Sequence, residues 1–100
     1  MRSRVAKHRH SAFQAQKGLC FYCNQPMVSA KKKHHPNRCT AEHLRAKCVG
    51  GSDRASNIVA ACWHCNHHRH AGKQHAPEPS EWKELMQATN KPSIDSVGTF

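Results

Sequence analysis

Two Cys-x-x-Cys pairs constrain the fold of this chain more than any other feature of its sequence. The pairs are Cys20/Cys23 and Cys62/Cys65. A gap of two residues allows both thiolates of a pair to reach one ion, and zinc prefers four ligands in a tetrahedron. The first pair follows Gly18, where a turn is expected, and the second pair opens a segment with helical character. The spacing therefore predicts one structural Zn²⁺ held by the four thiolates.

The composition explains why such a chain needs a metal. Hydrophobic residues make up 37% of the chain, but 12 of them are Ala and 6 are Cys, which leaves 19 large apolar or aromatic residues. Small domains with so little core are commonly held together by disulfides or by a metal ion. No apolar stretch of a secretory signal follows the basic N-terminus. A cytoplasmic protein with metal-bound thiols is therefore expected, rather than a secreted disulfide scaffold.

The charge of the chain points to a polyanionic partner. Sixteen Lys and Arg residues oppose six acidic residues, which gives a net charge of +10. Residues 1–77 carry fourteen basic and two acidic residues, whereas residues 78–100 carry two basic and four acidic residues. A field of this sign predicts DNA as the partner, and a merely solvated basic surface is the alternative. The longest apolar run, residues 58–63, is too short to cross a membrane, so no membrane partner is expected.

Local patterns predict a small α+β domain. Segments of helical character are separated by two short runs of strand-forming residues, with Gly and Pro at the boundaries. The predicted elements are a helix ending at Gly18, strands at 39–44 and 57–61, a helix over 62–71, and a helix around Trp82 capped by Ser80.

A further set of residues occurs in a characteristic order. It begins between the two cysteine pairs and includes the second pair. The set consists of Glu42-His43, Gly50-Gly51, Asn57, Cys62-x-x-Cys65-Asn66 and Arg69. In this order the sequence resembles the zinc-bearing members of the HNH endonuclease family. The resemblance covers residues 20–69 and implies a ββα-metal (His-Me) finger on a treble-clef zinc framework. The sequence departs from the family at Glu42, where Asp is commoner, and at Asn66, where the family name has a final His.

The resemblance implies metal-dependent hydrolysis of DNA phosphodiester bonds. Such a reaction needs a base for water and a cation beside the phosphate, and a neutral imidazole is a suitable base near physiological pH. Carboxylate and amide oxygens are hard ligands that suit Mg²⁺ or Mn²⁺. The family pattern thus implies His43 as the general base and Glu42 and Asn66 as ligands of one catalytic Mg²⁺ or Mn²⁺. Asn57 is expected to brace the loop and orient His43.

Basic residues outside this set are expected to hold the DNA backbone. Arg69 lies three positions after Asn66 on the same helical face, where it is predicted to pair with a phosphate oxygen. Lys31, Lys32 and Lys33 lie in a polar loop and are predicted to contact phosphates.

The implied organisation has three segments. Residues 1–19 form a basic, partly helical N-terminal segment, residues 20–72 form the nuclease domain with its structural zinc, and residues 73–100 form a linker, a short helix and a flexible acidic tail.

Each assignment has a structural alternative. Glu42 could serve only as an ion-pair partner, and Asn66 could bond locally within its helix. Neighbouring residues of a strand point to opposite faces, so Glu42 and His43 are expected to diverge. The rival function for the whole chain is a zinc-stabilised nucleic-acid-binding module without catalysis. A zinc-stabilised protein-interaction domain is the other rival, and the basic charge and the Glu42-His43 pair speak against it.

Some residues are assigned to the core. Cys39 and Cys48 fit no Cys-x-x-Cys pair and are predicted to be small buried residues. Phe21 and Trp63 are predicted to pack around the zinc rather than to stack on bases.

Overall fold

A computed structural model describes residues 3–47, 50–72 and 76–89. In these residues the chain forms a small α+β fold, with three α-helices, the 3₁₀ turn η2 and a two-stranded antiparallel sheet. The elements in chain order are α1 (Arg4–Ala15), β1 (Cys39–His43), η2 (Ala55–Asn57), β2 (Ile58–Cys62), α2 (Trp63–His70) and α3 (Pro79–Thr89). The predicted α+β class is confirmed, and both strands lie within one residue of their predicted bounds.

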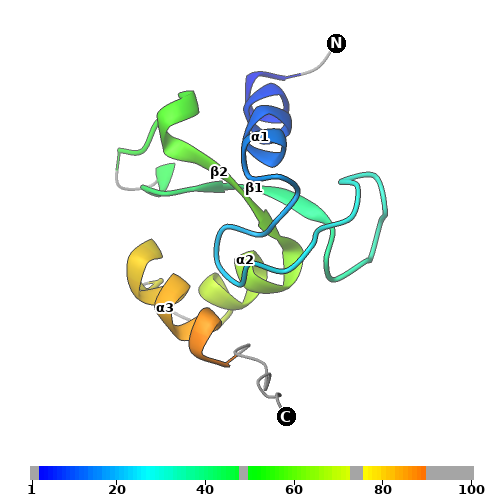
Figure 1. The fold of residues 1–100 in the computed structure, drawn as a ribbon. Helices are drawn as coiled ribbons and strands as arrows, with labels where there is room; N and C mark the ends of the chain where they lie inside the picture. Colours follow the sequence, from blue (N-terminus) through cyan, green and yellow to red (C-terminus); the bar gives the residue numbers. More distant parts are fainter. Residues whose placement is uncertain (1–2, 48–49, 73–75, 90–100) are drawn as a thin grey trace.

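The β1–β2 hairpin stands at the centre of the fold. Its register pairs Cys39 with Cys62 at one end and His43 with Ile58 at the other. Figure 1 shows α1 on one side of the hairpin and α2 with α3 on the other. Side chains of a strand alternate between its faces, so the odd-numbered residues of β1 face α1 and the even-numbered residues face α2. This alternation decides which helix each polar residue of β1 meets.

Helix α1 is fastened to the hairpin by a side-chain amide. The helix begins at an N-cap in which Ser3 accepts a hydrogen bond from the Ala6 N–H at 3.1 Å. Just after its end, the Gln16 side chain bonds both backbone groups of Ala60 on β2, at 2.8 and 3.0 Å. Gly18 has a φ of +76°, and a Cβ there would meet the Phe13 ring at 3.3 Å. The helix itself ends at Ala15, three residues before the predicted end, and Gly18 closes the turn that follows by donating its N–H to the Phe13 oxygen.

Helix α3 packs against α2 through one aromatic anchor. The indole N–H of Trp82 donates to the backbone oxygen of Cys65 at 3.0 Å, and Trp82 is buried. The helix begins at Pro79, so the prediction that Ser80 caps it is wrong: Ser80 lies inside the first turn. Proline is favoured at the first helical position because its missing N–H would have no partner there.

Cysteine sulfur makes up much of the core. The buried apolar cluster contains Cys20, Tyr22, Cys23, Met27, Cys39, Ala60, Ala61, Cys62, Cys65 and Trp82. Cys39 is buried as predicted, and Phe21 packs against the cluster, but Trp63 lies outside it. Trp63 instead stacks on His67 with ring centroids 4.4 Å apart, below the Arg38 guanidinium. The prediction for Cys48 falls outside the described residues.

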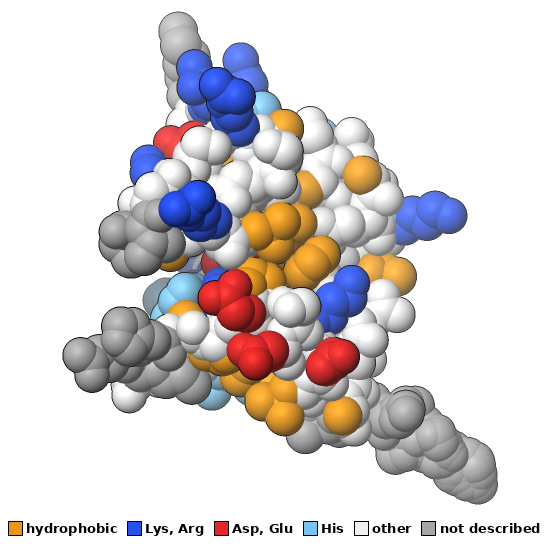
Figure 2. Space-filling view, turned by 90° about the vertical axis from the view of Figure 1, so that its left-hand side faces the viewer, with side chains coloured by type: hydrophobic (Ala, Val, Ile, Leu, Met, Phe, Trp, Pro, Cys, Tyr) orange, Lys and Arg blue, Asp and Glu red, His pale blue; other side chains and the backbone are white. Residues whose placement is uncertain are grey.

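The charges are divided between the two sides of the hairpin. The first 41 residues of the chain contain no Asp or Glu. In Figure 2 most of the acidic side chains gather over the lower half, where α3 lies, and several Lys and Arg side chains gather at the upper end. Every helix within the described ranges is too short or too polar to cross a membrane.

Candidate functional site

The two Cys-x-x-Cys pairs converge on one buried point. The sulfur atoms of Cys20, Cys23, Cys62 and Cys65 all lie within 4.8 Å of one another, and all four residues are buried. The Cys23 and Cys62 sulfurs are 3.9 Å apart. Ligands of a tetrahedral zinc with bonds of about 2.3 Å are separated by about 3.8 Å. The predicted four-cysteine cluster is thus confirmed, and its donor set and spacing fit a structural Zn²⁺.

Different local structures bring these cysteines together. Asn24 has a φ of +62° and donates its N–H to the Cys20 oxygen, which closes a tight turn around the first pair. Cys62 ends β2 and is the N-cap of α2, and Cys65 lies in the first turn of α2. The N–H groups of Tyr22 and Cys62 both approach the Cys20 sulfur at 3.3 Å, as expected for a thiolate.

The four thiols differ in their tendency to ionise because they interact with one another. Hydrogen bonding from Cys23 lowers the pKa of Cys20 below the ordinary thiol range. The pKa of Cys65 is raised, chiefly by its hydrogen bond with Cys20 and its other cysteine neighbours. Several thiolates this close repel one another, so all four ionise together only when a cation such as Zn²⁺ neutralises them.

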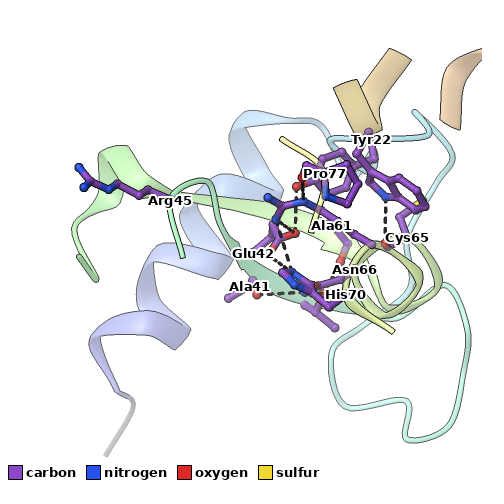
Figure 3. A network of polar contacts seen from close by, with 12 residues as sticks. Tyr22, Ala41, Glu42, Arg45, Ala61, Cys65, Asn66, His70 and Pro77 are labelled. Carbon is purple, nitrogen blue, oxygen red and sulfur yellow. Dashed lines mark hydrogen bonds and ion pairs between the residues drawn. The ribbon is translucent and has the colours of Figure 1, made fainter. Parts of the chain in front are cut away.

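Glu42 occupies a buried polar network rather than an open site (Figure 3). Its Oε2 accepts hydrogen bonds from the Tyr22 hydroxyl at 2.9 Å and from Arg69 Nη1 at 2.8 Å. Its Oε1 lies 3.6 Å from His70 Nε2. Burial, and then the Glu42 charge, raise the pKa of Tyr22, which keeps the hydroxyl protonated as a donor. Glu42 therefore does form an ion pair with Arg69, as the structural alternative predicts, through Oε2. Its Oε1 is not bonded by Arg69.

Arg69 lies in the core instead of on the surface. The residue is only 4% exposed, and its Nε donates to the Pro77 oxygen at 2.8 Å. The guanidinium thereby links α2, β1 and the segment that leads into α3. Because its charge is already paired with Glu42, the predicted contact between Arg69 and a phosphate does not fit this placement. The spacing from Asn66 was compatible with both locations, and only the packing distinguishes them.

Removing one partner of the Glu42–Arg69 pair should strongly destabilise the fold. Arg69→Ala leaves a buried carboxylate uncompensated, so the free energy of unfolding should fall by about 3–5 kcal/mol. Tyr22→Phe removes one neutral donor and should cost less, about 1–3 kcal/mol. Urea unfolding of both variants tests this ranking. A loss for Arg69→Ala of less than about 1 kcal/mol would show that the pair is unimportant to the fold.

His43 is held by an acidic residue that sequence reasoning missed. Its Nε2 lies 2.8 Å from Asp53 Oδ1, and Lys47 Nζ lies 2.9 Å from the other Asp53 oxygen. The hydrogen bond with His43, and then that with Lys47, lower the pKa of Asp53, so this carboxylate is ionised at neutral pH. The His43–Asp53 bond should weaken as pH falls through the lowered pKa of Asp53 and that carboxylate is protonated. An acidic residue ten positions after His43, beside the Gly50-Gly51 loop, was the available sequence signal.

Asn57 braces the loop that carries Asp53. Its side-chain oxygen accepts from the Arg45 N–H at 2.8 Å, and its Nδ2 donates to the Arg45 and Ser52 oxygens at 3.0 and 2.7 Å. These bonds join the two ends of the β1–β2 connection. Among the contacts of Asn57 in the described residues, none reaches the His43 ring. The expected orientation of His43 is therefore supplied by Asp53, and Asn57 acts on the loop that positions Asp53.

Asn66 lies on the α2 side of the hairpin, the side that Glu42 also faces. Its Nδ2 donates to Thr40 Oγ1 at 3.1 Å and to the Ala41 oxygen at 3.3 Å. Both bonds are donated by the amide nitrogen, so the amide oxygen of Asn66 can still bind a cation. Asn66 and His70, one helical turn apart, both line an open pocket of about 370 Å³. His70 is therefore a second residue that sequence reasoning missed, since it was one of several histidines on this helix.

The predicted basic loop is on the surface. Lys31, Lys32 and Lys33 are all exposed, in a turn that the Lys32 N–H closes onto the Ser29 oxygen at 3.0 Å. Their position suits contact with a large anion, and their role stays a prediction. No family model matches the chain, and no curated protein or solved structure matches it either.

Proposed function

We propose that this chain is a metal-dependent endonuclease of the HNH type, which hydrolyses phosphodiester bonds of DNA. The observation that carries the proposal is the His43–Asp53 pair at the end of β1, where a loop braced by Asn57 presents an imidazole that is only partly buried. The resemblance of residues 20–69 to that family supports the same role. The excess of basic over acidic residues supports an anionic substrate.

The pairing with Asp53 selects which imidazole nitrogen acts as the base. An ionised carboxylate can only accept a hydrogen bond, so Nε2 of a neutral His43 carries the proton that it donates to Asp53. The lone pair then lies on Nδ1. In the proposed reaction Nδ1 takes a proton from the attacking water, and the adjacent carboxylate stabilises the imidazolium that forms.

A catalytic cation would be held by side chains that project from the opposite face of β1. The proposed reaction therefore requires the scissile phosphate to lie at the end of β1, where Glu42 and His43 are neighbours. The candidate ligands are Asn66 through its amide oxygen, His70 through its ring, and Glu42 through Oε1, the oxygen not bonded by Arg69. Asn66 and His70 line one pocket, and Glu42 is buried outside its lining. A bound Mg²⁺ or Mn²⁺ would offset charge on the phosphate. Asn66 and Glu42 are held in place by Thr40, Tyr22 and Arg69, so their positions do not depend on the cation.

One observation favours the rival function. The Arg69 guanidinium neutralises Glu42, and this pairing weakens the attraction of that carboxylate for a second cation. A zinc-stabilised module that binds nucleic acid without cutting it would be compatible with such a pair. Nicking of supercoiled plasmid by the wild-type protein, with Mg²⁺ or Mn²⁺ and with neither, separates the two functions. Binding without nicking under every metal condition would favour the rival.

Asp53→Asn should lower the cleavage rate by about one to two orders of magnitude, because the amide can stabilise neither the tautomer nor the imidazolium in the same way. The effect should appear in kcat, with DNA affinity unchanged. In a His43→Ala background the same substitution should have no further effect, since it acts only through that ring. Lys47→Gln, which removes the other Asp53 partner, is the matched control. Equal losses from Asp53→Asn in both backgrounds would contradict a positioning role.

A further inference from the structure

A pocket between α1 and the basic loop has no role in the proposed reaction. It encloses about 360 Å³, which lies within the usual range for small-ligand pockets. Helix α1 contributes Arg9, His10 and Phe13, the loop contributes Ser29, Ala30 and Lys31, and Cys39 of β1 completes the lining. Burial raises the pKa of the Cys39 thiol, so this part of the lining is neutral.

The pocket combines an apolar interior with a cationic rim. Phe13, Ala30 and Cys39 supply the apolar part, and Arg9 and Lys31 supply two positive charges. Among the described residues neither cation forms an ion pair. A flat aromatic group joined to a phosphate matches both features, because bases stack on aromatic rings and phosphates pair with cations.

The surrounding charge favours an anion beside this pocket. Glu42 and Asp53 are paired with basic side chains. The other described carboxylates, Glu78, Glu81 and Glu84, belong to α3 and the segment just before it, which lie across the hairpin from α1 (Figures 1 and 2). A phosphate at the rim of the pocket would therefore meet no nearby carboxylate from α1 or the basic loop.

We propose that this pocket binds one unpaired nucleotide of a DNA strand, with its phosphate between Arg9 and Lys31 and its base against the Phe13 ring. The inference rests on the proposed function for the identity of the strand. Cys39 and His43 face the same side of β1, and the rise of a strand places their Cα atoms about 13 Å apart. A strand anchored in the pocket would thus run toward His43 within a few nucleotides.

Equilibrium binding can test the pocket independently of cleavage. Fluorescence anisotropy would be measured with a labelled oligothymidylate of about twelve nucleotides and with the corresponding duplex, using His43→Ala protein so that neither is cut. Arg9→Gln and Lys31→Gln should each weaken binding of the single strand by about three- to tenfold and lower the salt slope by about one. Lys83→Gln, on the acidic helix α3, removes the same charge elsewhere and should change affinity by less than about twofold.

A variant that fills the pocket separates a nucleotide site from a general basic surface. Ala30→Phe leaves the charge unchanged and should weaken single-strand binding by about fivefold or more, while duplex binding changes by less than about twofold. Phe13→Leu, which keeps an apolar side chain but removes the ring, should act in the same direction. Zinc content and thermal unfolding would confirm that each variant is folded. Unchanged single-strand binding by folded Ala30→Phe and Phe13→Leu proteins, or equal weakening of single strand and duplex, would overturn the proposal.

The two proposals fail in different ways. If wild-type protein does not nick plasmid but the pocket variants lose single-strand affinity as expected, the nuclease function is wrong and the nucleotide pocket stands. If wild-type protein nicks plasmid and the pocket variants bind normally, the pocket proposal is wrong and the nuclease function stands.

Discussion

Chelation of zinc should abolish the cooperative folding of this protein. Four of the ten residues in the buried apolar cluster are the cysteines that converge on one point. Structural zinc contributes about 10–16 kcal/mol in small zinc-finger peptides, whereas whole domains are stable by only about 5–15 kcal/mol. The free energy lost with the ion should therefore exceed the net free energy of unfolding of the domain. Far-UV circular dichroism should show loss of helix, and the thermal transition should disappear.

Two buried cysteines provide a matched pair of variants for this test. Cys65→Ser alters the cluster and should reproduce the effect of chelation, with loss of bound zinc. Cys39 is also buried but lies outside the four-sulfur group, so Cys39→Ala should retain zinc and a cooperative transition. A zinc-free wild-type protein that still unfolded cooperatively at the same temperature would show that the four thiols do not depend on a metal.

His43→Ala should lower plasmid nicking by about two to four orders of magnitude, the usual contribution of a general base. His43 is only partly buried and lies apart from the cysteine cluster, so zinc content, thermal stability and DNA affinity should persist. His64→Ala removes an exposed imidazole from α2 and is the matched control for loss of a histidine. Its rate should stay close to that of the wild type.

A metal titration distinguishes the base from the cation ligands. Asn66→Ala should lose activity by weakening the catalytic ion, so raising Mn²⁺ should restore part of the rate. The same titration should not rescue His43→Ala, because no added ion replaces a positioned proton acceptor. Asn66 is preferable to Glu42 for this experiment, since Glu42 also balances the buried charge of Arg69. Wild-type rates for His43→Ala would rule out the proposed mechanism.

Several parts of this protein could be predicted because they depend on neighbours in the sequence. Helix α1 ends at Ala15, and the turn that follows closes at Gly18, where the backbone requires a positive φ that glycine adopts easily. The Cys-x-x-Cys spacing predicted the four-cysteine cluster, since a two-residue gap limits where two sulfurs can point. The opposite directions of Glu42 and His43 also followed from strand alternation alone.

Other contacts depended on residues far apart in the chain. Tyr22 bonds Glu42 across twenty residues, and Arg69 bonds it across twenty-seven. No local pattern indicates that a cation three positions after Asn66 will be buried. Its location depends on the carboxylate that β1 places beside α2, and on the cost of leaving that carboxylate unpaired.

The sequence by itself determined the chemistry that this protein can offer: four cysteines spaced to bind zinc, a histidine followed by a glycine-rich loop, and 41 N-terminal residues without Asp or Glu. Only the tertiary structure decided which carboxylate serves which partner. Glu42 is buried with Arg69 and Tyr22, and Asp53 holds His43 near the surface. The reason is physical: two side chains form an ion pair only where packing brings them together. The spacing of residues along the chain determines such contacts within one helix or strand, but not between elements.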